Sequence, residues 1–194
     1  RELIAYPGAP LIARALLRPQ DRMVACEIQD AARKELISNL SRDPQARVVD
    51  LDGWTALTAY VPPNERRGLV LIDPPFEDKD EFSRLAEKFA AAYAKWPTGI
   101  YMLWNPAKER RGPERLARDV ASVAAAREGG NESCLRVEFS VAPQTADSGL
   151  VSTGLLIVNP PWTLASELRT ILPELEKPLG LGGAGRYRIE TVRP

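Results

Sequence analysis

Residues with the types and spacing needed for chemistry are concentrated in one tetrapeptide, Asp73-Pro74-Pro75-Phe76, which directly follows the apolar run 69–72. Prolines cannot extend a strand ladder, so they fix a rigid loop at the end of the strand. Such a loop can aim the Asp73 carboxylate and the Pro74 carbonyl at one amino group as two hydrogen-bond acceptors. They would draw the lone pair of a conjugated nitrogen, such as adenine N6, out of its ring and toward a methyl donor. The Asp73 carboxylate would also stabilise the positive charge that develops as the nitrogen is alkylated, and Phe76 offers a stacking face worth about 1–3 kcal/mol.

A second segment of the same form, Asn159-Pro160-Pro161-Trp162, follows the apolar run 155–158. Asparagine can replace aspartate in such a loop, so strand direction has to decide between the two segments. The run before Asn159 is expected to form the second arm of an antiparallel hairpin, which would point Asn159 away from the ligand-binding edge. Asp73 is therefore the predicted site, and a rigid turn with Phe76 in the core is the structural alternative.

Three acidic residues, Glu27, Asp52 and Asp73, each come just after a predicted strand. In a doubly wound fold the carboxyl ends of the strands line one crevice where ligands bind. Glu27 is placed to accept the two hydroxyls of a ribose, and Asp52, next to the flexible Gly53, could face an adenine amino group. The alternative for each residue alone is that it ends a strand and caps the next helix.

Short β-rich runs alternate with longer amphipathic stretches, which indicates an α/β fold with a doubly wound, mostly parallel sheet and a C-terminal antiparallel hairpin. We expect a single domain over residues 1–194. The glycine-rich segment 180–185 lacks the preceding strand and following helix of a phosphate-binding loop, so it is interpreted as a connector. Predicted helices span 11–18, 30–40, 81–95, 112–127 and 164–171, and predicted strands span 23–26, 47–49, 68–72, 98–104, 135–141, 154–158 and 187–192.

The composition excludes some kinds of catalytic and metal site. The chain has no histidine, which excludes a histidine general base or metal ligand within it, and no metal site is expected. Cys26 and Cys134 lie in apolar runs and are expected to be buried thiols of a cytoplasmic protein, and no apolar run is long enough to span a membrane. Formal net charge is zero, but basic residues gather at 66–67 and 108–118. These clusters suit either phosphate binding or a solvated helix face.

Taken in order, several motifs resemble the RlmJ-type adenine-N6 methyltransferases of large-subunit ribosomal RNA, almost from end to end. The resemblance implies S-adenosyl-L-methionine as methyl donor, protein-free 23S ribosomal RNA as substrate, and a monomeric cytoplasmic enzyme. It implies that Asp73, with Pro74, Pro75 and Phe76, forms the catalytic loop. It also implies that Ala9, Glu27, Asp52, Gly53 and Asp73 contact the donor, with Ala9 standing where the family usually has a serine. The segments that show the resemblance are 6–14, Glu27, Asp52-Gly53, 67–76, 98–101 and 154–162.

The family also has an N-terminal stretch with a first strand and a glycine-rich loop, which the printed sequence lacks. We expect that strand to lie between the strands that end at Glu27 and Asp73, and we expect this chain alone to bind the donor weakly. Two other functions stay open at this point: a DNA adenine-N6 methyltransferase, and a non-catalytic RNA-binding domain with a methyltransferase-like fold.

Overall fold

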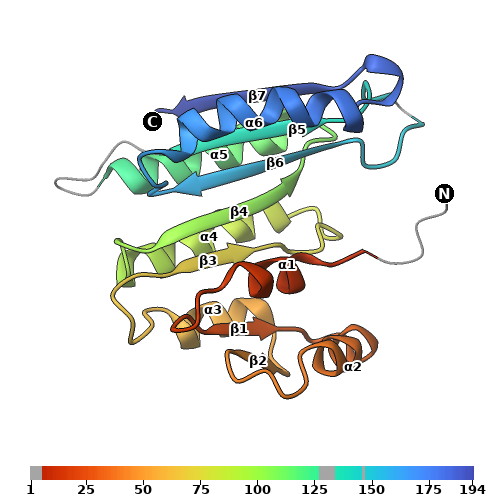
Figure 1. Cartoon of the computed structure of the whole chain (residues 1–194). Helices are drawn as coiled ribbons and strands as arrows, with labels where there is room; N and C mark the ends of the chain where they lie inside the picture. Colours follow the sequence, from red (N-terminus) through yellow and green to blue (C-terminus); the bar gives the residue numbers. More distant parts are fainter. Residues whose placement is uncertain (1–5, 127–133, 146) are drawn as a thin grey trace. The chain divides into compact units, whose positions relative to one another are not determined.

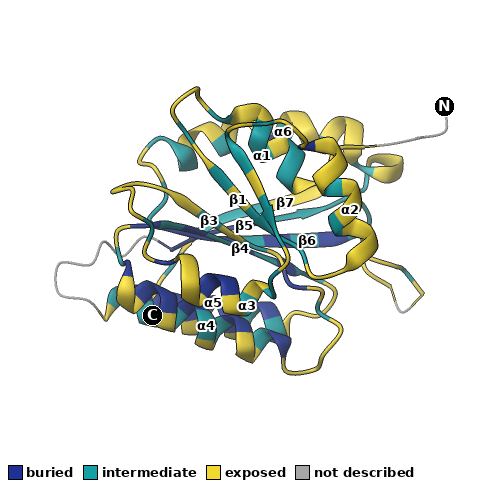
Figure 2. Cartoon of the chain, turned by 90° about the horizontal axis from the view of Figure 1, so that it is seen from below, coloured by how far each residue is buried: buried dark blue, intermediate teal, exposed yellow. Residues whose placement is uncertain are grey.

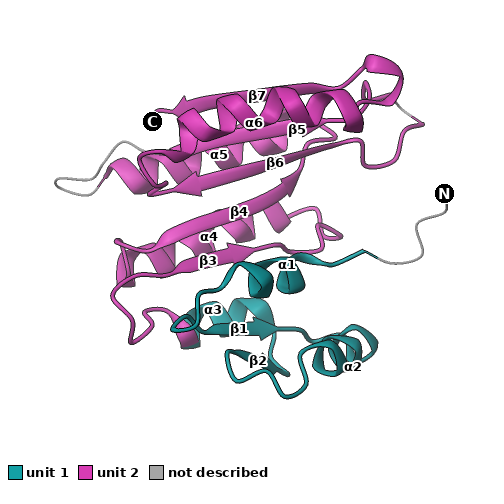
Figure 3. Ribbon diagram, viewed as in Figure 1, with its two compact units in different colours: residues 1–59 teal, residues 60–194 magenta. Residues whose placement is uncertain are grey.

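The computed structural model describes residues 6–126, 134–145 and 147–194. The chain divides into two compact units, residues 1–59 and residues 60–194 (Figure 3). The single domain expected over residues 1–194 stays a prediction.

The first unit is a small α/β unit built on two strands. Its strands β1 and β2 are parallel, with Cys26 paired to Val49 at the carboxyl end. Asp30 is the first residue of the helix that follows β1, and its carboxylate forms ion pairs with Arg33 and Lys34. The elements are α1 (Ala9–Leu16), β1 (Met23–Cys26), α2 (Asp30–Asn39), β2 (Ala46–Val49) and α3 (Gly53–Tyr60).

The second unit contains a five-stranded sheet in the order β3-β4-β6-β5-β7 (Figure 1). The β3/β4 ladder is parallel, whereas β6 is antiparallel to both β4 and β5, and β7 is antiparallel to β5. The elements are β3 (Leu69–Ile72), α4 (Glu81–Lys95), β4 (Ile100–Pro106), α5 (Arg111–Ala125), β5 (Cys134–Ser140), β6 (Ser152–Val158), α6 (Leu164–Leu179), the short 3-10 helix η1 (Leu181–Gly183) and β7 (Arg186–Val192).

The predicted α/β class and the antiparallel hairpin β5/β6 are confirmed, and the expected mostly parallel sheet is shown only in part, in the parallel ladders β1/β2 and β3/β4. This sheet is mixed, because β6 and β7 both run against β3, β4 and β5. The direct connection between β5 and β6 suits antiparallel neighbours. Strand β7 instead follows α6 and pairs antiparallel with β5 at the edge of the sheet, a direction that the expected pattern did not specify.

Helices cover both faces of the five-stranded sheet, with α4 and α5 on one face and α6 on the other (Figure 2). Side chains along β4 alternate in burial, so Tyr101 and Leu103 are fully buried. The Tyr101 ring packs edge-on against Phe89 of α4 at 5.3 Å between ring centroids. On the other face a buried cluster joins α6 to the sheet: Leu135, Val137, Ile157 and Leu172.

Two elements extend beyond their predicted ends. Helix α6 was expected to end at residue 171, before Pro173, but it continues to Leu179. Leu164, Leu168 and Leu172 lie on one face of α6 and pack on the sheet, and this burial offsets the backbone hydrogen bond that proline removes. Strand β4 likewise continues through Pro106, which pairs with Thr153 of β6. Among the described residues, no helix is both long and apolar enough to cross a membrane.

Candidate active site

The Asp73 loop begins at the carboxyl end of β3. Because β3 and β4 are parallel, with Ile72 paired to Leu103, Asp73 lies at the edge of the sheet toward which β4 also runs. Pro74 is buried and holds the loop against the protein, whereas Asp73 is exposed. Within the described chain the Asp73 carboxylate has no hydrogen-bond or ion-pair partner, and partial desolvation raises the pKa of its carboxyl group. Asp73 is therefore free to accept a hydrogen bond from a ligand.

Phe76 has a backbone φ of 53°, in the left-handed region that bulky residues rarely occupy. Such a conformation costs on the order of 1–3 kcal/mol and persists only where surrounding contacts impose it. Here the contacts are aromatic: the Phe76 ring lies 4.8 Å from the Phe82 ring and 5.9 Å from the Trp104 ring, centroid to centroid. The side chain is half-buried, so it is packed on one side and accessible on the other. Phe76 is thus packed against two aromatic rings without being fully in the core, and its stacking role stays a prediction.

Sequence reasoning missed the residues that support Phe76. Phe82 lies within the predicted helix 81–95 and Trp104 is the last residue of the predicted strand 98–104, and neither was assigned to the site. Gly112, the second residue of α5, lies against Phe82, because a Cβ atom at Gly112 would be 2.8 Å from the Phe82 ring. The available signal was an aromatic residue at the start of one element and another at the end of the next, both near the predicted loop.

In the first unit, the structure brings Glu27 and Asp52 to one edge of the β1/β2 sheet. The Glu27 amide donates a hydrogen bond to the Val49 carbonyl, so Glu27 lies beside the end of β2. One Glu27 carboxylate oxygen, Oε1, accepts a hydrogen bond from the Gln29 amide at 2.7 Å. Asp52 caps α3, because its Oδ2 accepts from the Thr55 amide at 2.9 Å. Both carboxylates take part in local turns, and each keeps one oxygen without a partner in the described chain.

The other two predicted donor-contacting residues in this unit begin helices. Gly53 is the first residue of α3, it is exposed, and a Cβ atom placed there would meet nothing within 4 Å. Ala9 is the first residue of α1 and is also exposed. Open space beside Gly53, close in sequence to the Asp52 carboxylate, is compatible with a planar ring bound at this edge.

Asn159 lies at the other edge of the five-stranded sheet. Val158, the last residue of β6, pairs with Tyr101 near the start of β4, so the predicted strand direction is confirmed. The Asn159 side-chain amide donates to the carbonyls of Pro97 and Gly99, both at 2.8 Å. Its backbone φ is 56°. Asn159 therefore joins β6 to the turn before β4, on the opposite edge from Asp73. The glycine-rich segment likewise connects α6 to β7, as expected.

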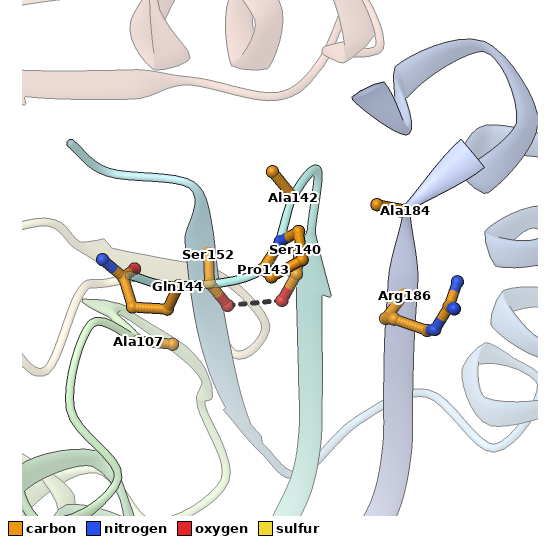
Figure 4. Close-up of a pocket in the computed structure, with 8 residues that line it drawn as sticks. All are labelled: Ala107, Ser140, Ala142, Pro143, Gln144, Ser152, Ala184 and Arg186. Atoms are coloured by element: carbon orange, nitrogen blue, oxygen red, sulfur yellow. Dashed lines mark hydrogen bonds between the residues drawn. The ribbon is translucent and has the colours of Figure 1, made fainter. Parts of the chain in front are cut away.

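A hollow of about 300 Å³ opens where β5 ends and β6 and β7 begin (Figure 4). The hydroxyls of Ser140 and Ser152 are hydrogen-bonded to each other at 2.7 Å across it. None of the predicted site residues lines this hollow. Its walls are formed by Ala107, Ser140, Ala142, Pro143, Gln144, Ser152, Ala184 and Arg186.

The fold places the chain among α/β proteins with helices on both faces of a mixed sheet. It is similar, with a TM-score of 0.56 over 88% of this chain and 58% of the other, to a probable spermidine synthase from Corynebacterium glutamicum. At 17% identity this likeness shows the fold alone. A family model described as "Ribosomal RNA large subunit methyltransferase D, RlmJ" matches residues 1–192. The chain belongs to this family of ribosomal RNA methyltransferases.

Individual relatives agree with that assignment. The chain is 36% identical over 193 residues to ribosomal RNA large subunit methyltransferase J of Escherichia coli, and 36% identical over 194 residues to the protein of the same name from Haemophilus influenzae. In both cases the match covers 100% of this chain and 67% of the relative. A protein of known structure from Legionella pneumophila is 32% identical, with a TM-score of 0.83 over 96% of this chain and 66% of that one. The chain thus spans about two thirds of the length of these relatives.

Proposed function

We propose that this chain belongs to an S-adenosyl-L-methionine-dependent methyltransferase that modifies adenine N6 in 23S ribosomal RNA. It provides part of the donor site and the loop Asp73-Pro74-Pro75-Phe76, the acceptor loop, which binds the adenine. Membership of the ribosomal RNA methyltransferase family supports the reaction class. The observation that supports the assignment of the site is the Asp73 carboxylate, which is exposed at the carboxyl edge of the sheet and has no partner in the described chain.

The acceptor chemistry follows from the loop. The N6 amino group has two hydrogens, and Asp73 and the Pro74 carbonyl are the two acceptors for them. Hydrogen bonding to both hydrogens directs the nitrogen lone pair out of the plane of the base. With the donor bound, the nitrogen would take the methyl group, the donor would leave as a neutral thioether, and the surplus N–H proton would pass to the Asp73 carboxylate, its hydrogen-bond acceptor, and from there to solvent. The accessible side of the Phe76 ring stacks on the base.

The donor side is assigned to the first unit. S-adenosyl-L-methionine supplies an electrophilic methyl group on a sulfonium when it is bound. The free carboxylate oxygen of Glu27 fits the ribose hydroxyls, and the free oxygen of Asp52 fits the adenine amino group of the donor. The open space beside Gly53 leaves room for the adenine ring. At Ala9, where the family usually has a serine, only the backbone can hydrogen-bond the donor.

Three further parts of the proposal rest on the family alone. They are the choice of 23S ribosomal RNA free of ribosomal proteins, the monomeric state, and action in the cytoplasm. Ribosomal RNA as the substrate class agrees with the names of the relatives.

The test is methyl transfer from labelled S-adenosyl-L-methionine in the whole protein that contains this chain. Protein-free 23S ribosomal RNA should be methylated on an adenine, and Asp73→Ala should abolish transfer while thermal unfolding stays unchanged. Preference for duplex DNA over ribosomal RNA would show a DNA adenine methyltransferase instead. RNA binding without transfer to any nucleic acid would show a non-catalytic RNA-binding protein.

A further inference from the structure

The second unit has two clusters of exposed arginine and lysine, and the fold places them at opposite edges of its sheet. Arg66 and Arg67 precede β3, at its amino end. Lys108, Arg110 and Arg111 follow β4, at its carboxyl end, which is the edge where Asp73 lies. All five side chains belong to exposed residues. Only the cluster after β4 shares an edge with the proposed acceptor loop.

Direct packing connects this second cluster to the acceptor loop. Gly112, adjacent to Arg111, lies against Phe82, since a Cβ atom added there would be 2.8 Å from the ring. Phe82 in turn packs against Phe76 with 4.8 Å between ring centroids. A single aromatic ring therefore separates the start of α5 from the side chain proposed to stack on the target base.

The charges of this cluster are only partly compensated by neighbouring carboxylates. Arg110 pairs with Glu114 at 3.6 Å, as expected for a solvated helix face. Lys108 and Arg111 have no ion-pair or hydrogen-bond partner within the described residues. Two exposed, uncompensated cations beside the loop are a suitable surface for phosphate.

The opposite charge gathers in the segment between Phe76 and α4. Residues 77–81 contain four carboxylates and one lysine, whereas residues 107–111 contain three cations and one carboxylate. Within the first of these segments, Glu81 is buried and its Oε1 lies 3.7 Å from Arg84, which also pairs with Asp78 at 3.6 Å. Glu77 and Asp80 are exposed and have no ion-pair partner among the described residues. Phosphate is repelled by the acidic segment and attracted by the basic one. Negative charge therefore predominates in the segment after Phe76, and positive charge predominates in the segment after β4.

We propose that Lys108 and Arg111 bind backbone phosphates of the RNA next to the target adenine, so that the strand leaves the acceptor loop over residues 107–111 and away from residues 77–81. This proposal rests on the proposed function, because it takes the substrate to be RNA with its target base at Phe76. It goes further by specifying the side on which the backbone runs and the side chains that hold it.

The experiment compares two matched double variants of the whole protein. Lys108→Gln/Arg111→Gln removes two charges at the Asp73 edge, and Arg66→Gln/Arg67→Gln removes two charges at the other edge. All four side chains are exposed and unpaired within the described chain, so both variants should unfold at the wild-type temperature. Binding of a short, fluorescently labelled single-stranded RNA containing one adenine is measured by anisotropy as a function of potassium chloride concentration.

The expected change follows from counterion release. Each phosphate contact with single-stranded nucleic acid contributes about 0.7 to the slope of log affinity against log salt. Loss of two contacts should lower the slope by about 1.4 and, at 0.1 M salt, weaken binding by about 25-fold. In methylation assays KM for RNA should rise by a similar factor, with kcat at saturating RNA unchanged. The Arg66/Arg67 variant should match the wild type.

Two results would overturn the proposal, and a third would overturn the proposed function alone. Wild-type slope and affinity in the Lys108/Arg111 variant would exclude phosphate contacts there, even if the protein methylates adenine normally. Equal losses in both double variants would show a general charge effect rather than a path for the backbone. If the wild type shows the expected slope and the variant loses it, but no methyl group is transferred, the proposed function fails and the RNA surface stands.

Discussion

Replacing Asn159 tests which of the two Pro-Pro segments, 73–76 or 159–162, has the catalytic role. If Asn159 were the acceptor residue, Asn159→Asp would produce a segment of the same form as Asp73-Pro74-Pro75-Phe76, and activity would persist. In the structure, however, the Asn159 amide donates to two carbonyls, those of Pro97 and Gly99, at 2.8 Å each. An aspartate would place a carboxylate oxygen against those carbonyls, and the resulting repulsion should destabilise the protein more than loss of the side chain does.

The magnitude can be worked out from these contacts. Each lost hydrogen bond contributes about 1 kcal/mol net, so removing both costs about 2 kcal/mol. Asn159 also has a φ of 56°, and a residue other than glycine or asparagine costs about 1 kcal/mol more in that conformation. Asn159→Gly should therefore lower the free energy of unfolding by about 2 kcal/mol and Asn159→Ala by about 3 kcal/mol. At about 2–4 °C per kcal/mol, the alanine variant should unfold about 6–12 °C below the wild type.

The assay is thermal unfolding followed by circular dichroism, together with methyl transfer measured at a temperature where every variant is folded. The expected order of stability is wild type, then Asn159→Gly, Asn159→Ala and Asn159→Asp. Activity per folded molecule should be unchanged in all of them. An Asn159→Asp protein as stable as the wild type, or an Asn159→Ala protein that is fully folded but inactive, would refute the structural role and move the candidate site to Asn159.

Three further predictions concern other positions. Asp73→Asn should reduce kcat by about 100- to 1,000-fold. Because desolvation raises the pKa of the Asp73 carboxyl, kcat of the wild type should fall on acidification at a pH above the usual aspartate range, as a pH–rate profile would show. The same pKa shift means that folding disfavours the charged form of Asp73, so Asp73→Asn should be at least as stable as the wild type at neutral pH. Any gain in stability should vanish below the usual aspartate pKa. Lower stability of Asp73→Asn at neutral pH would contradict this. Gly53→Ala should leave unfolding unchanged, since its Cβ meets nothing within 4 Å, but weaken S-adenosyl-L-methionine binding in calorimetry; unchanged affinity would remove Gly53 from the donor site. Burial raises the pKa of the Cys134 thiol to about 12, so iodoacetamide at neutral pH should label this thiol only after the protein is unfolded in urea. Peptide mass spectrometry would detect the label. Rapid labelling of the folded protein would show that the core around Cys134 is open.

Elements with a strong periodic pattern were predicted closely from the sequence. The helix Glu81–Lys95 has the predicted bounds because its apolar residues repeat with the helical period, and the strand Met23–Cys26 has them because a short, continuous apolar run stands between polar residues. Helix α6 was predicted too short, because a proline is a local signal for a helix end, whereas the packing of Leu172 on the sheet depends on residues far away in the sequence.

The position of the acceptor loop was predicted from the sequence, but its backbone conformation was not. The position of Asp73 after an apolar strand could be inferred from proline chemistry and strand length. The left-handed conformation of Phe76 could not, since phenylalanine has no preference for it and the cause lies in the Phe82 and Trp104 rings. Likewise, the polarity of charge around the loop became visible only when residues 107–111 were placed at the same edge of the sheet as Asp73.

The positive φ of Phe76 limits which residues can replace it in related proteins. A β-branched side chain in that conformation crowds its own backbone, so isoleucine, valine and threonine should be excluded at this position however well they might fill the space. Aromatic residues with an unbranched Cβ keep the ring, and glycine or asparagine would keep only the backbone. Trp162, in the equivalent place of the other segment, is 93% exposed and has no such backbone constraint. Few residue types should therefore occur at position 76 in related proteins and many at position 162, although the two segments have similar amino-acid sequences.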